Sequence, residues 1–507
     1  MNDSNARQSP HIYSQWYGDA AYFGLHYDLH ARASDTELGE RADPETLIPL
    51  LKLMSPEWVQ TDCKGHPGYT SWYSRVPDAS VSPGVQKDAL TGWRAATTAL
   101  GLKLHCHYSG LWDQAAGKKH PEWAVLDKNG QRLIGDGEQT YAVMAPLGPY
   151  IDELRNKQFI ELIDRYQVDG FWVDGDIWCV QTDYDERAVV AFQAATGIVQ
   201  PPRDASDSNW DRWMAFTRQT YYDYVTRYCD AVHTHKSGVL VCSNWLQTFR
   251  NPGKPKVPTD WISGDNTWIF GLDASRYEAR FISTRGKHWD IMLWDFYKIG
   301  DMADPTRPWV FKPVQMLQQE AAVTLALGGA VQIYESQNGL RNGQLVPWRM
   351  KHLGEVGEFV KARRELCQHT ETIPQVAVLH SEHHFYAHAE LPFPDADKQA
   401  RPVKGATYAL LENHYNVDLL DEWALLPRID TFPLIVAAEQ DHMSDAMVDA
   451  LKAYVERGGR LVVTGAAAYE RFGSTFLGVQ SAQTEAKQTC YISTGADPYA
   501  AVVYSEQ

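Results

Sequence analysis

The sequence predicts an α/β fold, a TIM (β/α)8 barrel followed by a smaller doubly wound domain. Its 507 residues are enough for two or three domains at about 150 residues each. Short β-branched or aromatic runs alternate with amphipathic stretches up to about residue 335, and the pattern restarts after Gln375. Such alternation is typical of βα units with a parallel sheet, and eight units match the size of a barrel with long loops.

The strands and helices of the barrel follow from this pattern in chain order. The runs that predict strands are 22–30, 58–64, 102–109, 168–175, 238–244, 259–265, 289–296 and 330–335. The amphipathic stretches that predict helices are 44–54, 88–100, 150–166, 211–235, 273–286 and 314–327. Each helix is long enough to return the chain to the start of the next parallel strand.

The second domain is predicted from a shorter set of elements. Strand-like runs lie at 375–380, 432–439 and 458–465, with a helix at about 444–456. We therefore expect a catalytic barrel over 1–370 and an α/β domain over 374–485. The remaining residues, 486–507, are expected to be a tail or the start of a further segment.

Composition excludes several classes of protein. The formal net charge of −17 repels phosphate backbones and anionic membranes, so nucleic-acid and membrane partners are not expected. Neither a signal-peptide pattern at the start nor an apolar run near the roughly 20 residues that span a bilayer is found, so we expect a cytoplasmic protein unless a leader was trimmed. The seven cysteines are scattered and never spaced as CxxC, which argues against a disulfide framework and a structural zinc site.

Polar side chains gather near the C-terminal ends of the expected strands, where barrels of this fold carry their active sites. For any single carboxylate, helix capping or pairing with a basic residue is an equally good explanation, but the whole set indicates a pocket. In strand order the set comprises His26, Asp28, His30, Gln60, Asp62, Lys64, His105, His107, Trp172, Asp174, Asn244, Ser263, Asp265, Asp295 and Glu335.

The residue types narrow the chemistry. The sequence has no GxSxG elbow, Walker A loop or GxGxxG after a strand, so serine hydrolases, P-loop NTPases and Rossmann enzymes lack support. Two carboxyl groups on opposing strand ends are the minimal equipment for cleaving a glycosidic bond. Tryptophans close to the strand ends could stack on sugar rings, although each alone is more often core or loop packing. They are Trp72, Trp112, Trp178, Trp245 and Trp268.

A family resemblance is carried by three segments, VQTDCKGHPGYTSWYS, KDALTGWRAATTALGLKLHCHYS and VDGFWVDGD. They resemble the strand-two to strand-four region of the glycoside hydrolase family 29 α-L-fucosidases and of related family 151. The resemblance implies that Asp174 is the nucleophile and that His30 is the histidine of strand one. Matches to the family's KHHDGF and YYS motifs are Lys64, His66, Tyr69, Tyr108 and Ser109. Gly65 and Pro67 depart from the first motif, so the resemblance concerns the reaction class more than the sugar.

The C-terminal unit resembles the trimerisation domain of family 42 β-galactosidases and of family 151. That domain is itself similar to flavodoxin-like glutamine amidotransferases. No cysteine occupies a nucleophile turn of this unit, because Cys367 and Cys490 lie outside its strand ends. We therefore expect a structural or oligomerising domain, and a homo-oligomer that is a dimer or trimer.

These observations predict a retaining, exo-acting glycoside hydrolase that removes a terminal α-L-fucoside-like sugar without a metal or other cofactor. Asp174 attacks, kept ionised by Lys64 or by ring nitrogens. Asp265 is the first choice for the acid/base and Glu335 the second, ahead of Asp176 and Asp295. The expected substrate-binding residues are His26, Asp28, His30, Asp62, Lys64, His66, His107, Tyr108, Trp112, Trp172, Asn244 and Trp245.

Two alternatives remain open at this point. A metal-dependent barrel hydrolase could use His26, His30, His105 and His107 as ligands, although strands five and six offer no further histidine. A catalytically inactive barrel that only binds carbohydrate is the second alternative, and the carboxylates on strands four and six argue against it.

Overall fold

The computed structural model describes residues 17, 21–137, 140–266, 271–300, 308–336, 340–465, 470–479, 489–492 and 503–506. Its central feature is a ring of eight parallel strands in the order β7-β6-β5-β2-β1-β12-β9-β8. They are β1 (Phe23–Tyr27), β2 (Trp58–Lys64), β5 (Lys103–Ser109), β6 (Gly170–Asp174), β7 (Leu240–Ser243), β8 (Ile262–Asn266), β9 (Trp289–Trp294) and β12 (Ala330–Glu335). Backbone bonds from Asp260 N to Val241 O (2.8 Å) and from Trp245 N to Ser263 O (3.2 Å) join β7 to β8. The predicted barrel is confirmed.

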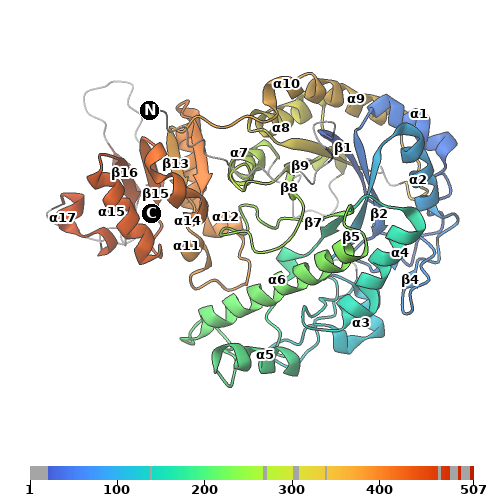
Figure 1. Ribbon diagram of the computed structural model, residues 1–507, viewed down its shortest axis with the longest axis horizontal. Helices are drawn as coiled ribbons and strands as arrows, with labels where there is room; N and C mark the ends of the chain where they lie inside the picture. Colours follow the sequence, from blue (N-terminus) through green and yellow to red (C-terminus); the bar gives the residue numbers. More distant parts are fainter. Residues whose placement is uncertain are drawn as a thin grey trace, which may run out of the picture.

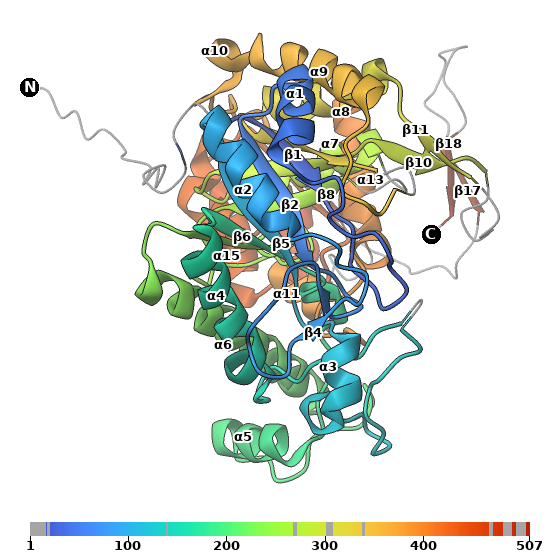
Figure 2. The same cartoon turned by 90° about the vertical axis from the view of Figure 1, so that its right-hand side faces the viewer.

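Helices surround the barrel on its outer face (Figure 1). The six expected ones correspond to α1 (Pro44–Met54), α2 (Ala89–Leu100), α4 (Asn156–Tyr166), α6 (Trp210–His235), α7 (Gly271–Ile282) and α8 (Val314–Ala326). A further helix, α9 (Pro347–Lys361), lies beside α1 and α8, and Figure 2 shows this group on the opposite side of the barrel from α4 and α6. Aspartates begin the first two helices, because Asp43 and Asp88 accept hydrogen bonds from Thr46 N and Thr91 N.

Shorter elements fill the loops between these strands and helices. They are β3 (Tyr69–Thr70), β4 (Ser80–Val81), α3 (Gln114–Lys119), η2 (Pro121–Trp123), η3 (Ile151–Arg155), η4 (Ile177–Cys179), α5 (Glu186–Thr196), β10 (Phe296–Lys298), β11 (Trp309–Phe311) and α10 (Arg364–Cys367). None of the described helices is sufficiently long and apolar to cross a bilayer.

The second sheet has four parallel strands in the order β14-β13-β15-β16. Its strands are β13 (Val376–Leu379), β14 (Val417–Leu420), β15 (Leu434–Ala438) and β16 (Arg460–Thr464). Its helices are α11 (Glu382–Tyr386), α12 (Ala396–Gln399), α13 (Arg401–Glu412), α14 (Glu422–Leu425), η5 (Leu426–Thr431), α15 (Asp445–Glu456) and α17 (Ser474–Leu477). This order is the flavodoxin-like arrangement for the first four strands. The sequence pattern missed β14, a four-residue edge strand interrupted by Asp418, which pairs with Arg428 (2.9 Å).

A buried ion pair fastens the second sheet to the barrel. Arg285, just after α7, donates to both oxygens of Asp421 at 2.7 and 3.1 Å, and neither side chain is exposed. Asp421 also caps α14 through Ala424 N. The expected boundary at 370–374 stays a prediction. In the last predicted segment, β17 (Thr489–Ile492) and β18 (Val503–Glu506) pair antiparallel, and the rest of it lies outside the described residues.

Candidate active site

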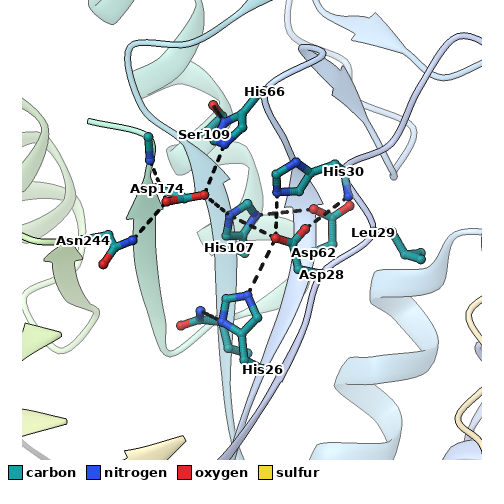
Figure 3. Close-up of polar contacts among 12 residues, drawn as sticks. His26, Asp28, Leu29, His30, Asp62, His66, His107, Ser109, Asp174 and Asn244 are labelled. Carbon is teal, nitrogen blue, oxygen red and sulfur yellow. Dashed lines mark hydrogen bonds and ion pairs between the residues drawn. The ribbon is translucent and has the colours of Figure 1, made fainter. Parts of the chain in front are cut away.

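Asp174 ends β6 at the centre of a cluster of polar side chains (Figure 3). Its Oδ1 accepts hydrogen bonds from Gly175 N (2.7 Å) and Asn244 Nδ2 (3.1 Å). Its Oδ2 lies 3.3 Å from Nε2 of both His66 and His107. Burial opposes ionisation of this carboxyl, but the hydrogen bond from His107 and nearby positive charge outweigh it and hold the Asp174 pKa well below its usual range. Asp174 is therefore a carboxylate near neutral pH.

His107 on β5 lies between three carboxyl groups. Its Nε2 is 3.3 Å from Asp28 Oδ2 and from Asp174 Oδ2, and its Nδ1 is 3.4 Å from Asp62 Oδ1. Burial disfavours the imidazolium, but the charges of Asp28 and Asp174 raise the His107 pKa well above its ordinary value. A buried cation thus balances part of the negative charge at the centre of the site.

Asp62 on β2 completes this group. Burial and the neighbouring charge of Asp28 raise the Asp62 pKa to about 6, against the opposing effect of His107. The Asp62 side chain is buried, and among the described residues its Oδ1 faces only His107 Nδ1, at 3.4 Å, while its Oδ2 has no hydrogen-bond donor. A buried acceptor of this kind fits a ligand that brings its own hydroxyl hydrogens.

Asp28 connects two histidines of the first strand region. Its Oδ2 lies 2.7 Å from His30 Nε2 and 3.7 Å from His26 Nε2, and its Oδ1 accepts from His30 N at 3.1 Å. His26 Nδ1 contacts the amide of Gln60 deeper in the barrel. Burial lowers the His26 pKa, so its ring is neutral near pH 7 and can both donate and accept hydrogen bonds.

The conformation of His30 explains the departure at Gly65 from the family motif. His30 adopts a left-handed backbone conformation with φ 46°. A Cβ on Gly65 would lie 2.5 Å from His30 Cγ and 2.6 Å from its Cα, so no larger residue fits without displacing His30. Arg341 holds the same turn, because its Nη2 donates to His30 O at 3.2 Å and its Nε to Asp35 Oδ1 at 2.7 Å.

His66 is fixed in one tautomer by its neighbours. Ser109 Oγ lies 2.7 Å from Trp112 O, which can only accept, so the single hydroxyl proton goes there. His66 Nδ1, 2.7 Å from the same Oγ, must then be the donor. Burial lowers the His66 pKa to about 3, so the ring is neutral and its Nε2 directs a lone pair at Asp174.

Asp265 on β8 faces Asp174 across the amide of Asn244. Asn244 Nδ2 donates to Asp265 Oδ2 at 2.8 Å as well as to Asp174 Oδ1 at 3.1 Å. Trp294 Nε1 donates to the other oxygen of Asp265 at 3.3 Å. Burial and the charge of Asp174 raise the Asp265 pKa to about 7. Below about pH 7, Asp174 is therefore ionised while Asp265 is mostly protonated.

Lys64 and Tyr108 do not join the site, and their predicted roles there are wrong. The register of β2 against β5 shifts between Asp62 and Lys64, so a bulge ends the alternation of inward and outward residues. Lys64 consequently lies behind the barrel wall, where it pairs with Asp113 and donates to Tyr150 OH (3.1 Å) and Tyr108 OH (3.2 Å). Ring nitrogens are the other source of stabilisation that the sequence suggested, and the nitrogen that faces Asp174 in this way is Nε2 of the cationic His107.

The three other candidate acids also point away from Asp174. Glu335 is the outward residue at the end of β12 and lies 3.1 Å from Arg349 Nε, and Arg349 also contacts Asp295. Asp176 accepts from Ser243 Oγ (3.0 Å) and Tyr228 OH (3.1 Å) on the outer face. The prediction of Glu335 as a catalytic residue is therefore wrong, and Asp176 and Asp295 are structural.

Some of the predicted aromatic residues lie at the site and others lie away from it. Trp172 lies inside the barrel, with its ring 5.2 Å from that of His26. Trp112 packs edge-on against His66 at 4.8 Å, and Trp178 lies between Trp112 and Trp245, 6.3 and 6.1 Å from them. Trp72 is buried outside the site and donates to Glu161. Trp268 lies outside the described residues.

Three aromatic residues near the site were missed by sequence reasoning. Tyr334 packs its ring against His26 at 4.8 Å, and Trp294 donates to Asp265. Strict alternation along β12 and β9 could have identified both, because each shares a face with other inward residues. Tyr141, 5.5 Å from the His66 ring, comes from a loop and had no such signal. It borders an open cavity of about 450 Å³ that is also lined by Arg32, Tyr69, Gln114 and Lys118.

In the part of the chain that the structure describes, two sets of three side chains offer ligand atoms within 4.8 Å of one another, as a metal ion would need. The sets are His26, Asp28, His107 and His30, His107, Asp174. His105 belongs to neither set. It lies two residues earlier on β5, with Nε2 2.7 Å from Tyr17 OH and its ring 5.2 Å from Trp261. The four-histidine metal site considered from the sequence is therefore not formed.

The chain is similar in sequence and in fold to known glycosidases. The sequence model of the α-L-fucosidase family matches residues 31–248. The fold matches α-L-fucosidase isoenzyme 2 from Paenibacillus thiaminolyticus with a TM-score of 0.70 at 20% identity, over 88% of this chain and 64% of that one. It also matches the β-galactosidase from Bacillus circulans sp. alkalophilus with a TM-score of 0.61 at 13% identity, over 90% and 72% of the two chains. No curated protein sequence matches.

The family match covers the segment that contains the centre of the site, from Asp62 to Asn244. The chain spans 64% of the length of the Paenibacillus enzyme, which has additional residues. At these identities the structural matches establish the barrel fold. Residues 31–248 match the model of the α-L-fucosidase family, whose members are glycoside hydrolases.

Proposed function

We propose that the chain is a retaining exo-glycosidase that removes a terminal α-L-fucose or a related sugar, with Asp174 as nucleophile and Asp265 as acid/base. The observation that carries the proposal is the single amide nitrogen of Asn244 that binds both carboxyl groups. Because Nδ2 lies 3.1 Å from Asp174 Oδ1 and 2.8 Å from Asp265 Oδ2, these oxygens are no more than about 5.9 Å apart, the sum of the two distances.

This separation favours retention over inversion. Retaining glycosidases place their carboxyl groups about 5–5.5 Å apart, whereas inverting ones need about 6.5–9.5 Å to admit a water molecule. The bound of about 5.9 Å from the Asn244 contacts lies below the inverting range. The opposed pKa directions of Asp174 and Asp265 also fit the two roles, because the nucleophile must be ionised and the acid protonated.

Two chemical steps follow from these roles. In the first, an oxygen of Asp174 bonds to the anomeric carbon while Asp265 gives its proton to the departing glycosidic oxygen. In the second, the Asp265 carboxylate takes a proton from water, whose oxygen attacks the same carbon and releases Asp174. The chemistry consumes one water and regenerates both carboxyl groups.

Sugar hydroxyls would be bound by the ring nitrogens of His26, His30 and His66 and by the oxygens of Asp28 and Asp62. Buried Asp62 supports this assignment, because its Oδ2 has no donor among the described residues and a hydroxyl hydrogen would satisfy it. The rings of Trp112 and Tyr141 lie 5.8 Å apart beside His66 and offer an apolar surface to the sugar. The α-L-fucosidase match ranks fucose first, and the β-galactosidase fold match makes galactose the competing outcome.

A screen of aryl glycosides tests the proposal. The set comprises the α-L-fucoside, β-D-galactoside, α-L-arabinoside and β-D-xyloside, assayed with wild type, Asp174→Ala and Asp176→Asn as a matched carboxylate control. We expect turnover of the α-L-fucoside, its loss in Asp174→Ala, and partial rescue of that variant by azide. Full activity of Asp174→Ala on the substrate that wild type cleaves would overturn the nucleophile assignment.

The second domain carries a separate expectation. Its flavodoxin-like sheet and its resemblance to a trimerisation domain lead us to propose a dimer or trimer in solution. Light scattering coupled to size exclusion measures this directly, and a monomer at micromolar concentration would contradict it. A cytoplasmic location stays a prediction of the sequence.

A further inference from the structure

We propose that His30, His107 and Asp174 bind a divalent transition-metal ion such as Zn²⁺, and that the bound ion inhibits the enzyme. The binding itself does not depend on the proposed function, whereas the inhibition rests on it. The three side chains each offer one ligand atom within 4.8 Å of the other two. Two imidazoles and one carboxylate form a donor set that zinc uses when it keeps one coordination position open.

The separations of these atoms fit a shared ion. His107 Nε2 lies 3.3 Å from Asp174 Oδ2, within hydrogen-bond distance. Two ligands about 2.0–2.1 Å from a tetrahedral ion lie about 3.3–3.4 Å apart. The pair thus stands at the spacing of two ligands of one metal ion.

The groups behind the ligands hold them in the orientation that a metal needs. His107 Nδ1 lies 3.4 Å from Asp62 Oδ1, so its Nε2 is the nitrogen that faces Asp28 and Asp174 (Figure 3). A carboxylate on the far nitrogen is the usual support of a metal-binding histidine. The ion would displace the Nε2 proton of the His107 imidazolium, which leaves to solvent. The His30 side chain is 23% exposed, whereas that of His107 is fully buried, so an ion can reach the set from solvent at His30.

Neighbouring electron pairs add to the attraction for a cation. The His66 tautomer leaves a lone pair on Nε2, 3.3 Å from the Asp174 Oδ2 carboxylate oxygen. Asp28 Oδ2 lies 3.3 Å from His107 Nε2 and adds a second negative charge. An ion bound here would occupy an oxygen of Asp174, the proposed nucleophile, and it would exclude the substrate hydroxyls from the same side chains. Inhibition competitive with the glycoside follows.

Equilibrium dialysis against Zn²⁺ followed by elemental analysis tests the binding. The full chain, first stripped with a chelator, is compared with His30→Gln, Asp174→Asn and the control His235→Gln. His235 lies outside the site, and its Nε2 is 2.7 Å from Asp164 Oδ1. Like His30, it is therefore a histidine paired with an aspartate, which makes His235→Gln a matched control for His30→Gln. Circular dichroism confirms that each variant is folded.

We expect one tightly bound Zn²⁺ per chain, weakened at least about 10-fold in both site variants and unchanged in the control. Absence of stoichiometric binding, or equal binding by His30→Gln and wild type, would overturn the inference.

Zn²⁺ should also inhibit chelator-treated active enzyme in competition with the substrate. If the protein binds Zn²⁺ at this site but cleaves no glycoside, the metal site stands and the proposed function fails. If it cleaves a glycoside without binding Zn²⁺, the reverse holds.

Discussion

Asp174 and Asp176 lie two residues apart, and both are buried, yet they have opposite surroundings. Asp174 faces into the barrel among the nitrogens of His66, His107 and Asn244, and its pKa is held well below the usual range despite burial. Asp176 faces outward to the hydroxyls of Ser243 and Tyr228, and burial raises its pKa to about 6. Gly175, with φ 61°, turns the chain between them.

The difference shows what separates a catalytic carboxylate from a structural one in this barrel. Both residues are buried, so burial cannot explain why the pKa of one is lowered and that of the other is raised. Cationic and N–H partners keep Asp174 ionised, while burial and the charge of Asp174 raise the pKa of Asp265, across the same amide, to about 7. A division of roles between neighbouring carboxyl groups arises from their partners rather than from their depth.

The largest expected effect separates Asp174 from Asp176. Asp174→Asn should lower kcat/KM by about 10⁴-fold, because residues that act as a catalytic unit cost this much or more when one is removed. Asp176→Asn should lower it by less than about 10-fold and mainly change stability. Initial rates on the best aryl glycoside, together with thermal unfolding of each variant, measure both. Similar losses in the two variants would remove the basis of the comparison.

Asp265→Asn should give the next largest effect, and its size should depend on the leaving group. Loss of a general acid costs about 10²–10⁴-fold. Aryl glycosides with good leaving groups need little proton transfer, so their hydrolysis should lose less than that of an alkyl glycoside. An equal loss on both substrates would show that Asp265 does not protonate the leaving oxygen.

The pH dependence of kcat/KM should show that Asp265 acts in its protonated form and Asp174 in its ionised form. Asp265 acts in its protonated form, so activity should be high below its pKa of about 7 and fall as pH rises through this value. The low pKa of Asp174 keeps the nucleophile ionised throughout this window. Replacing Asp265 by Asn should abolish the alkaline decline. If the decline persists in that variant, another group titrates.

A smaller effect is expected at Gly65. Gly65→Ala places a methyl group 2.5 Å from His30 Cγ, so His30 must move and lose its 2.7 Å contact with Asp28. We expect KM to rise about 10-fold with little change in kcat, since His30 binds the sugar rather than reacting. Gly238→Ala provides a control, because a Cβ there meets no atom within 4 Å and, as at Gly65, φ is not positive. A fall in kcat alone would contradict this role.

The strict alternation of strand residues made much of the fold and site predictable. The positions of the eight barrel strands, and the inward Asp174, Asn244 and Asp265, follow from it. The prediction from alternation failed where a strand departs from regular geometry, as at the bulge in β2 that turns Lys64 outward. It was misapplied at Glu335, since Tyr334 is the inward residue and Glu335 meets Arg349. The bridge formed by Asn244 between two strands depends on atomic distances that no sequence pattern contains.

The stereochemistry of the first product tests the central claim most directly. Proton NMR during the first minutes of hydrolysis distinguishes the two anomers before they interconvert. A carboxyl pair bridged by one amide predicts release of the sugar with the anomeric configuration of the substrate. Release of the opposite anomer would contradict the assignment of Asp174 and Asp265 as a retaining pair.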